Sequence, residues 1–254
     1  MKVLICGSGL LGKYLHSILA INNELTSYLI SLKESNFNDF KNKYNLLDKN
    51  DILIDSMDPN NINNDFDIQV NKKAIKFRNY ALKNSSQISY FYISTANLYE
   101  KSLSLIDERS ELKKNFSPYL KMKLNSENLV KKYCKSNFAI LRIVNIWSNN
   151  QTNSFFGDLI NAKNKNLVID PRKNDEDVIS YANIHDICKL IEHIIISQNT
   201  GIINISTNCF DTRENLKARV NSTEIMGFNN REGYRIHSKV INWKMILKNK
   251  KELF

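Results

Sequence analysis

A glycine-rich segment close to the N-terminus constrains the fold of this chain more than any other feature. An apolar run over residues 2–6 has the composition of a buried strand, and Gly7-Ser8-Gly9-Leu10-Leu11-Gly12 follows it directly. The amphipathic spacing of Leu11, Leu15 and Ile18 then predicts a helix. A strand, a GxGxxG turn and a helix in this order open the dinucleotide-binding α/β fold. The sequence therefore predicts a Rossmann-type fold.

Each part of the loop has an expected role in binding a pyrophosphate. Gly7 permits the tight turn, Gly9 lets the backbone approach the phosphates, and Gly12 allows the helix to pack closely on the strand. The first N–H groups of the helix, at Leu10 and Leu11, would face the phosphates with the positive end of the helix dipole.

The end of the second predicted strand bears on the choice of cofactor. An NAD-binding chain usually has an acidic residue there, which accepts hydrogen bonds from the adenine ribose. This chain has Ser31 and Lys33, which suit the 2′-phosphate of NADP, and then Glu34. We expect NADP as the cofactor, with NAD possible because of Glu34.

Apolar runs typical of strands alternate with helical patterns, which indicates a parallel α/β architecture. Strands are predicted over residues 2–6, 27–32, 51–55, 89–94 and 138–143, and a long helix over 118–135. We expect a doubly wound parallel sheet in an NAD(P)-binding domain of residues 1–145. Residues 146–254 would form a small C-terminal substrate-binding lobe, interleaved with the end of that sheet. Short strands are expected there over 166–169 and 202–206, and helices over 185–197 and 243–251.

Composition argues against several other classes of protein. The apolar runs are far shorter than the roughly 20 residues that span a bilayer, and the N-terminus has no signal-peptide pattern. A soluble cytoplasmic protein without a membrane partner is expected. The four cysteines are widely spaced without a CxxC pair, which favours reduced thiols over a metal site. The formal charge of +10 fits scattered surface lysines or attraction of an anionic substrate, and no nucleic-acid motif accompanies it, so no nucleic-acid partner is expected.

Tyr119 and Lys123 form the strongest catalytic candidate. They stand four residues apart, on one face of the predicted helix. A nearby ammonium stabilises a phenolate and brings the ordinary tyrosine pKa, near 10, towards the range needed for acid–base catalysis. Upstream, a predicted strand ends in hydroxyl residues at Ser94 and Thr95. One of these hydroxyls could bind a substrate carbonyl oxygen while Tyr119 delivers a proton to it.

Together these segments resemble the extended branch of the short-chain dehydrogenase/reductase superfamily, the NAD-dependent epimerase/dehydratase proteins. The resemblance covers residues 1–210. The run from Ser94 to Tyr99 is similar to the family's "ST-A-x-V-Y-G", and the run from Ser117 to Lys123 is similar to "SPYxxSK". Three further segments resemble the family's "N-V", "LRxxNVYG" and "FVHVDD": Val70-Asn71, Leu141–Trp147 and Tyr181–Asp186.

The resemblance implies roles for individual residues. Thr95 would be the catalytic hydroxyl, Tyr119 the acid–base group, and Lys123 its partner and a ligand of the nicotinamide ribose. Further cofactor contacts are expected from Ser56, Met57 and Ile93. Substrate contacts are expected from Thr95, Ala96, Asn97, Asn145 and Arg172, and Arg142, Lys163 and Lys165 are further candidates for the substrate diphosphate.

Departures from the family pattern bear on the reaction. The family's dehydratases have Asp-Glu after the catalytic Thr, where this chain has Ala96 and Asn97, so a dehydratase is disfavoured. No Cys/His pair for a combined epimerase and reductase is evident. The loop is one residue shorter than the usual GxxGxxG of the branch, and the stretch from Asp55 to Pro59 lacks the family's "HLAA".

The resemblance thus implies an NAD(P)-dependent reductase of a nucleotide-linked keto-deoxy sugar, in surface polysaccharide or deoxysugar biosynthesis. Within that family, the chain most resembles the nucleotide-sugar 4-ketoreductases, such as the dTDP-4-dehydrorhamnose reductases. A nucleotide-sugar 4-epimerase is the alternative, because it needs the same three catalytic residues. A non-catalytic cofactor-binding regulatory or scaffold protein is a further alternative. By resemblance, a homodimer is possible.

Overall fold

The computed structural model of the chain describes residues 1–58, 65–149, 155–165, 177–221, 234–242 and 246–247. They fall into two compact units. The first unit comprises residues 1–95, 115–142 and 191–203, and the second comprises residues 96–114, 143–190 and 204–254. The predicted lobe boundary at residue 145 stays a prediction.

A six-stranded sheet in the order β2-β1-β3-β4-β5-β8 forms the centre of the fold. Its strands are β1 (Lys2–Cys6), β2 (Thr26–Ile30), β3 (Ile52–Asp55), β4 (Ser89–Thr95), β5 (Phe138–Ile143) and β8 (Gly201–Ile205). β1 pairs in parallel with both β2 and β3, and β3 pairs in parallel with β4. The predicted Rossmann-type α/β sheet is thereby confirmed.

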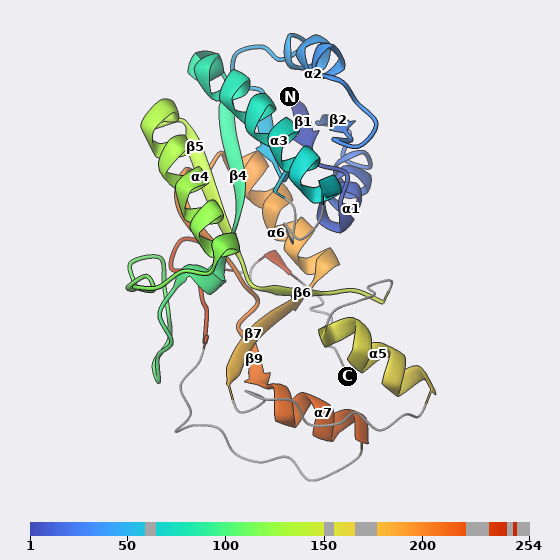
Figure 1. Cartoon of the computed structure of the whole chain (residues 1–254), viewed down its shortest axis with the longest axis vertical. Helices are drawn as coiled ribbons and strands as arrows, with labels where there is room; N and C mark the ends of the chain where they lie inside the picture. The colour runs from blue at the N-terminus through green and yellow to red at the C-terminus, as the bar shows by residue number, and fades with distance from the viewer. Residues whose placement is uncertain (59–64, 150–154, 166–176, 222–233, 243–245, 248–254) are drawn as a thin grey trace. The chain divides into compact units, whose positions relative to one another are not determined.

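Helices connect these strands. They are α1 (Leu10–Leu19), α2 (Phe37–Tyr44), α3 (Asp65–Lys83) and α4 (Pro118–Cys134), and α3 and α4 lie side by side on one face of the sheet (Figure 1). α1 packs against β1 and β2. The chain runs outward from β1 to β2 and then returns to β3 beside β1, so the direction of winding reverses between β1 and β3. Open α/β sheets bind ligands at such a reversal.

The sheet has one strand fewer beyond β2 than the common strand order 3-2-1-4-5-6 of this fold. Residues 31–51 are described throughout, and they contain α2 but no strand. β2 is therefore an edge strand. Lys43 of α2 donates its Nζ to the carbonyl oxygen of Leu29 at 3.0 Å, and a lysine on an exposed edge discourages further strand pairing.

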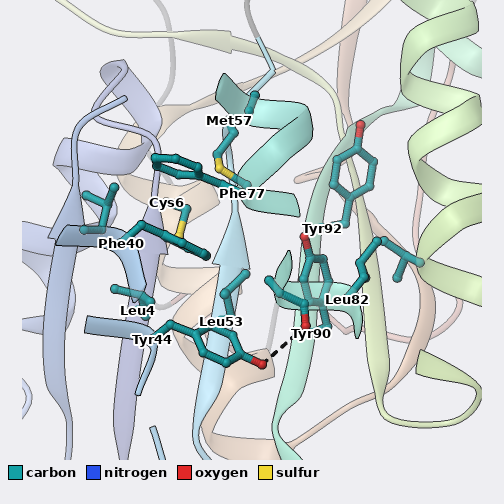
Figure 2. Close-up of a cluster of buried hydrophobic side chains, with 14 of the residues drawn as sticks. Leu4, Cys6, Phe40, Tyr44, Leu53, Met57, Phe77, Leu82, Tyr90 and Tyr92 are labelled. Carbon is teal, nitrogen blue, oxygen red and sulfur yellow. Dashed lines mark hydrogen bonds between the residues drawn. The ribbon is translucent and has the colours of Figure 1, made fainter. Parts of the chain in front are cut away.

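The core between the sheet and α2 and α3 is rich in aromatic side chains (Figure 2). The rings of Phe40 and Phe77 are stacked with their centroids 4.6 Å apart. Tyr44 donates its hydroxyl to the carbonyl oxygen of Ala81 at 3.3 Å. On α3, the side chains of Ala74, Phe77 and Ala81 are all buried and form its apolar face.

The second unit has its own sheet and core. Its strands, in the order β6-β7-β9, are β6 (Asn145–Trp147), β7 (Val178–Asn183) and β9 (Cys209–Thr212), and its helices are α5 (Phe155–Lys165) and α7 (Arg213–Asn221). A further helix, α6 (Ile184–Ser197), runs from the second unit into the first. The core of the second unit is built around Trp147, Phe156, Leu159, Ile179, Tyr181 and Leu216. The predicted strand over 166–169 and most of the predicted helix over 243–251 lie outside the described residues.

Candidate active site

The glycine loop lies where the winding of the sheet reverses. Gly7 N donates to the carbonyl oxygen of Ile30 at 2.9 Å, and Ser56 N donates to that of Cys6 at 2.8 Å. Gly7 has a φ of +118°, and a Cβ added there would lie 2.1 Å from the carbonyl oxygen of Ser56. Only glycine can occupy this position, because both the backbone conformation and the contact with Ser56 exclude a side chain.

The other two glycines of the loop, Gly9 and Gly12, differ in the space around them. A Cβ on Gly12 would lie 1.9 Å from the carbonyl oxygen of Gly7, so Gly12 allows the close approach of α1 to the turn. A Cβ on Gly9 would meet no atom within 4 Å, so the space beside Gly9 is open. Gly9 is the N-cap of α1, and it offers no side chain to the first N–H groups. The first turn of α1 has no acidic residue either, so these donors and the helix dipole suit the pyrophosphate of a dinucleotide.

Ser31, a further predicted cofactor contact, lies beside the loop, and Lys33 follows it in the chain. Ser8 donates its hydroxyl to the hydroxyl oxygen of Ser31 at 2.9 Å, which fixes Ser31 at the end of β2. Lys33 and Glu34 are exposed in the turn that follows. No acidic side chain stands at the end of β2 itself.

After β3, the predicted cofactor contacts Ser56 and Met57 differ in what they could offer to a cofactor. Ser56 presents its backbone to Gly7, as described above. The side chain of Met57 is buried in the aromatic core (Figure 2), so a bound cofactor could meet this residue only through its backbone.

The proposed catalytic residues lie on two neighbouring elements of the first unit, Thr95 at the end of β4 and Tyr119 and Lys123 on α4. Pro118 opens α4, and Ser117 caps the helix by accepting a hydrogen bond from Leu120 N at 3.4 Å. Tyr119 lies in the first turn, and Lys123 Nζ lies 5.7 Å from the centroid of its ring. The same ammonium donates to the carbonyl oxygen of Ile93 at 2.9 Å. This bond fixes α4 to the end of β4, two residues before Thr95.

A buried ionic cluster surrounds Lys123, and sequence reasoning missed it. We call Asp55, Asp58, Arg78 and Lys123 the Asp58 cluster. Lys123 Nζ lies 3.2 Å from Asp58 Oδ2, and Arg78 Nη2 donates to Asp58 Oδ1 at 2.7 Å. Arg78 also donates to Asp55 through Nε, at 2.5 Å, and through Nη2, at 3.1 Å. Two carboxylates thus balance two cations within the core.

Tyrosines of β4 complete this cluster. Tyr90 donates its hydroxyl to Asp55 Oδ2 at 2.7 Å, and Tyr92 donates to Asp58 Oδ2 at 2.5 Å. Burial alone would raise the pKa of Asp58, but the charges of Lys123 and Arg78, with the hydrogen bonds from Tyr92 and Arg78, hold that pKa well below its usual range. Burial raises the pKa of Tyr92 well above 10, and the charge of Asp58 raises it further. Tyr92 is therefore held in its neutral form.

A second buried ion pair joins α4 to β5. Arg142 donates to Glu127 through Nε at 2.9 Å and through Nη2 at 2.7 Å, and Ser94 donates its hydroxyl to Glu127 Oε1 at 2.6 Å. Arg142 is 2% exposed. Because its guanidinium is bound within the core, the structure does not support its predicted contact with a substrate diphosphate.

The predicted substrate contacts are described only in part. Ala96 is buried and Asn97 is half-buried, both in the short 3-10 helix that directly follows β4. Asn145 begins β6 and donates its Nδ2 to the carbonyl oxygen of Ser180 at 2.9 Å. Arg172 and the side chains of Lys163 and Lys165 lie outside the described residues.

Asn71, in the segment that resembles the family's "N-V", has a buried Oδ1 without a hydrogen-bond partner among the described residues. The described part of the chain contains no group of three or more His, Cys, Asp or Glu side chains placed to hold a metal ion. None of the helices described is long and apolar enough to cross a membrane.

Solved structures of nucleotide-sugar enzymes share this fold. A dTDP-4-dehydrorhamnose reductase from Clostridium acetobutylicum is 18% identical, covering 93% of this chain and 89% of its own, with a TM-score of 0.70. A UDP-glucuronic acid 4-epimerase from Bacillus cereus, in complex with NAD, is 15% identical, covering 100% and 95%, with a TM-score of 0.74. A dTDP-glucose 4,6-dehydratase from Bacillus anthracis, in complex with NAD, is 14% identical, covering 98% and 91%, with a TM-score of 0.72. At these identities the likeness concerns the fold.

Sequence comparison identifies the family. Comparison with curated proteins gives no match. The sequence model of the NAD dependent epimerase/dehydratase family matches residues 73–206, more than half of the chain. The matched range includes Thr95, Tyr119 and Lys123. The glycine loop lies before this range, and the evidence for its role as a dinucleotide-binding turn is its own geometry. This chain belongs to the NAD dependent epimerase/dehydratase family.

Proposed function

We propose that the protein is an NAD(P)-dependent reductase of a nucleotide-linked keto-deoxy sugar. The observation that carries the proposal is the docking of Lys123 on the carbonyl oxygen of Ile93, which brings the Tyr119/Lys123 pair to the strand end that bears Thr95. The open space at Gly9, at the reversal of the same sheet, fits a dinucleotide. The similar structures include a reductase, an epimerase and a dehydratase of nucleotide sugars, and the three residues suit the first two of these reactions.

In the proposed reaction, the glycine loop and the first turn of α1 would hold the pyrophosphate of the cofactor, whose reduced nicotinamide would supply a hydride to the carbonyl carbon of the sugar. Tyr119 gives its hydroxyl proton to the carbonyl oxygen, and the product is an alcohol. Thr95 donates a hydrogen bond to the same oxygen and orients it. Lys123 stabilises the phenolate that forms on Tyr119, which then regains a proton from solvent.

NADP is the favoured cofactor, and NAD remains the alternative. The end of β2 offers the hydroxyl of Ser31 and, in the exposed turn, Lys33, while the acidic side chain of Glu34 lies one residue further on. A cationic side chain there suits the 2′-phosphate of NADP. A role in surface polysaccharide or deoxysugar biosynthesis, a cytoplasmic location and a homodimer are part of this proposal.

Incubation with NADPH or NADH and a panel of nucleotide 4-keto-6-deoxy sugars tests the reaction. Absorbance of the reduced nicotinamide should fall with the wild-type protein and stay constant with Tyr119→Phe. Tyr133→Phe is the matched control, because Tyr133 lies on the same helix with 41% of its surface exposed. Isomerisation of a sugar without net oxidation of the cofactor would favour the 4-epimerase instead. Cofactor binding without turnover of any sugar would contradict the proposed reaction and favour a non-catalytic role.

A further inference from the structure

We propose that Asp58 is a positioning residue for the Tyr119/Lys123 pair, because its carboxylate and the carbonyl of Ile93 together hold the Lys123 ammonium in one place. The proposal rests on the proposed function, in which Lys123 stabilises the phenolate of Tyr119 and binds the nicotinamide ribose.

The ammonium of Lys123 is nearly saturated by these two acceptors. A lysine ammonium has three N–H donors and no acceptor. The carbonyl oxygen of Ile93, at 2.9 Å, and Asp58 Oδ2, at 3.2 Å, account for two of them. One N–H is then left for a hydroxyl of a bound nicotinamide ribose. Lys123 has a flexible four-carbon stem, so without Asp58 it would be tethered only by Ile93.

Asp58 is itself fixed from both sides. Arg78 Nη2 donates to its Oδ1 at 2.7 Å, and the Tyr92 hydroxyl donates to its Oδ2 at 2.5 Å. The Asp58 side chain is fully buried. Arg78 in turn is held by Asp55 and by Ser126 Oγ, which accepts from Nη1 at 2.9 Å. The position of the Lys123 ammonium is therefore set by a chain of charge-assisted hydrogen bonds that begins on β3 and α3.

Asp58 also distinguishes between the two tyrosines beside Lys123. The ammonium lies 5.3 Å from the ring centroid of Tyr92 and 5.7 Å from that of Tyr119. The Tyr92 hydroxyl donates to Asp58, and a carboxylate acceptor opposes loss of its proton. Tyr119 is half-buried on the first turn of α4. The carboxylate thus keeps Tyr92 protonated, so that Tyr92 does not compete with Tyr119 for the role beside Lys123.

Nitrogen-15 NMR of the lysine ammonium groups tests the positioning directly, in the protein without cofactor. Only ammonium groups held by hydrogen bonds exchange slowly enough to give sharp signals, and the Lys123 signal is the one lost in Lys123→Arg. We expect Asp58→Asn to abolish or broaden this signal. Asp48→Asn is the matched control, because Asp48 pairs with the exposed Lys2 at 2.6 Å and should leave the Lys123 signal unchanged. A sharp and unshifted Lys123 signal in Asp58→Asn would overturn the proposal.

A second variant covers the case in which Asp58→Asn does not fold. Tyr92→Phe keeps both charges and removes only the hydrogen bond that fixes Asp58 Oδ2. We expect its Lys123 signal to exchange with solvent several-fold faster than in the wild type. An unchanged exchange rate in Tyr92→Phe would also count against the proposal.

The affinity for the cofactor tests whether this positioning matters for function. We expect Asp58→Asn to bind NADPH or NADH about ten-fold more weakly, as loss of one charge-assisted hydrogen bond predicts, by titration of cofactor fluorescence. Unchanged affinity would show that Asp58 does not position Lys123 for the cofactor. If the wild type binds neither cofactor, the proposed function fails, while the NMR result still decides whether Asp58 positions Lys123.

Discussion

The buried pair of Glu127 and Arg142 allows a quantitative test of what holds α4 on the sheet. In Glu127→Gln, Arg142 would keep its charge at 2% exposure and lose the carboxylate that binds both Nε and Nη2. Removing one partner of a buried ion pair costs about 3–5 kcal/mol. For a chain of this size, each kcal/mol lowers Tm by roughly 2–4 °C, so we expect Tm to fall by roughly 6–20 °C.

The double variant Glu127→Gln/Arg142→Met measures the interaction energy between the two side chains, apart from their contacts with other residues. It removes both charges, so neither is left uncompensated in the core. We expect its loss of stability to be smaller than the sum of the two single losses by about 0.5–3 kcal/mol, the coupling typical of residues in contact. Lys131→Gln is the matched control, since Lys131 lies 3.8 Å from Glu127 and its side chain is 37% exposed. An exposed pair of this kind contributes at most about 1 kcal/mol.

Urea unfolding followed by circular dichroism and thermal unfolding would measure these differences in the apo protein. Additive losses in the double variant would refute the reasoning, because they would mean that the two side chains act independently. A loss below about 1 kcal/mol in Glu127→Gln would refute it as well, because an uncompensated buried guanidinium costs more than that.

Three further predictions address the cofactor loop, the Asp58 cluster and the cofactor preference. Gly9→Ala should weaken NADPH or NADH binding by about ten-fold or more in fluorescence titrations and leave Tm unchanged, since its Cβ meets no protein atom. Gly12→Ala should lower both the cofactor affinity and Tm, because its Cβ would clash with the carbonyl oxygen of Gly7. Unchanged affinity in Gly9→Ala would contradict the placement of the pyrophosphate. The pKa of Asp58 is lowered on folding, so its stabilising effect is complete above the unfolded value of about 4 and is lost as the pH falls below it. Urea unfolding between pH 6 and about 3 should therefore show a smaller acid loss of stability in Asp58→Asn than in the wild type, and parallel losses would argue against this. Ser31→Asp should shift the NADH-to-NADPH affinity ratio about ten-fold towards NADH, and an unchanged ratio would place the 2′ position of the ribose elsewhere.

The strands of the main sheet could be predicted closely, because strands of a parallel sheet are buried on both faces and form continuous apolar runs. Residues 2–6 and 138–143 were predicted with the bounds that β1 and β5 have. α2 was not predicted, because it is short and polar. It begins at a capping box in which Asn36 and Asp39 each bond to the backbone of the other. The absence of a strand beyond β2 follows from this, since the chain that could have formed one is used in α2.

The candidate site was predictable only where it lies in short segments. Tyr119 and Lys123 are one helical turn apart, so their proximity follows from spacing. Asp58, Arg78 and Lys123 come from three separate segments, and only the tertiary structure brings their charges together. The available signal was weak: two acidic residues, Asp55 and Asp58, where a buried strand ends, and an arginine on the apolar face of α3. Hydrophobic periodicity cannot show which cation balances which carboxylate.

The hydroxyl groups along β4 have a consequence for how the sheet is assembled. Tyr90, Tyr92 and Ser94 alternate along one face of the strand, and each donates to a different buried carboxylate. A slip of the strand by one residue would turn all three hydroxyls to the opposite face. Phe91 and Ile93 on the other face are buried as well, so burial alone opposes such a slip only weakly, but each carboxylate would lose a hydrogen bond at a cost of about 1–3 kcal/mol. The three hydroxyl–carboxylate hydrogen bonds therefore select one register of β4 during folding. Hydrophobic burial alone would not distinguish that register from one shifted by a residue.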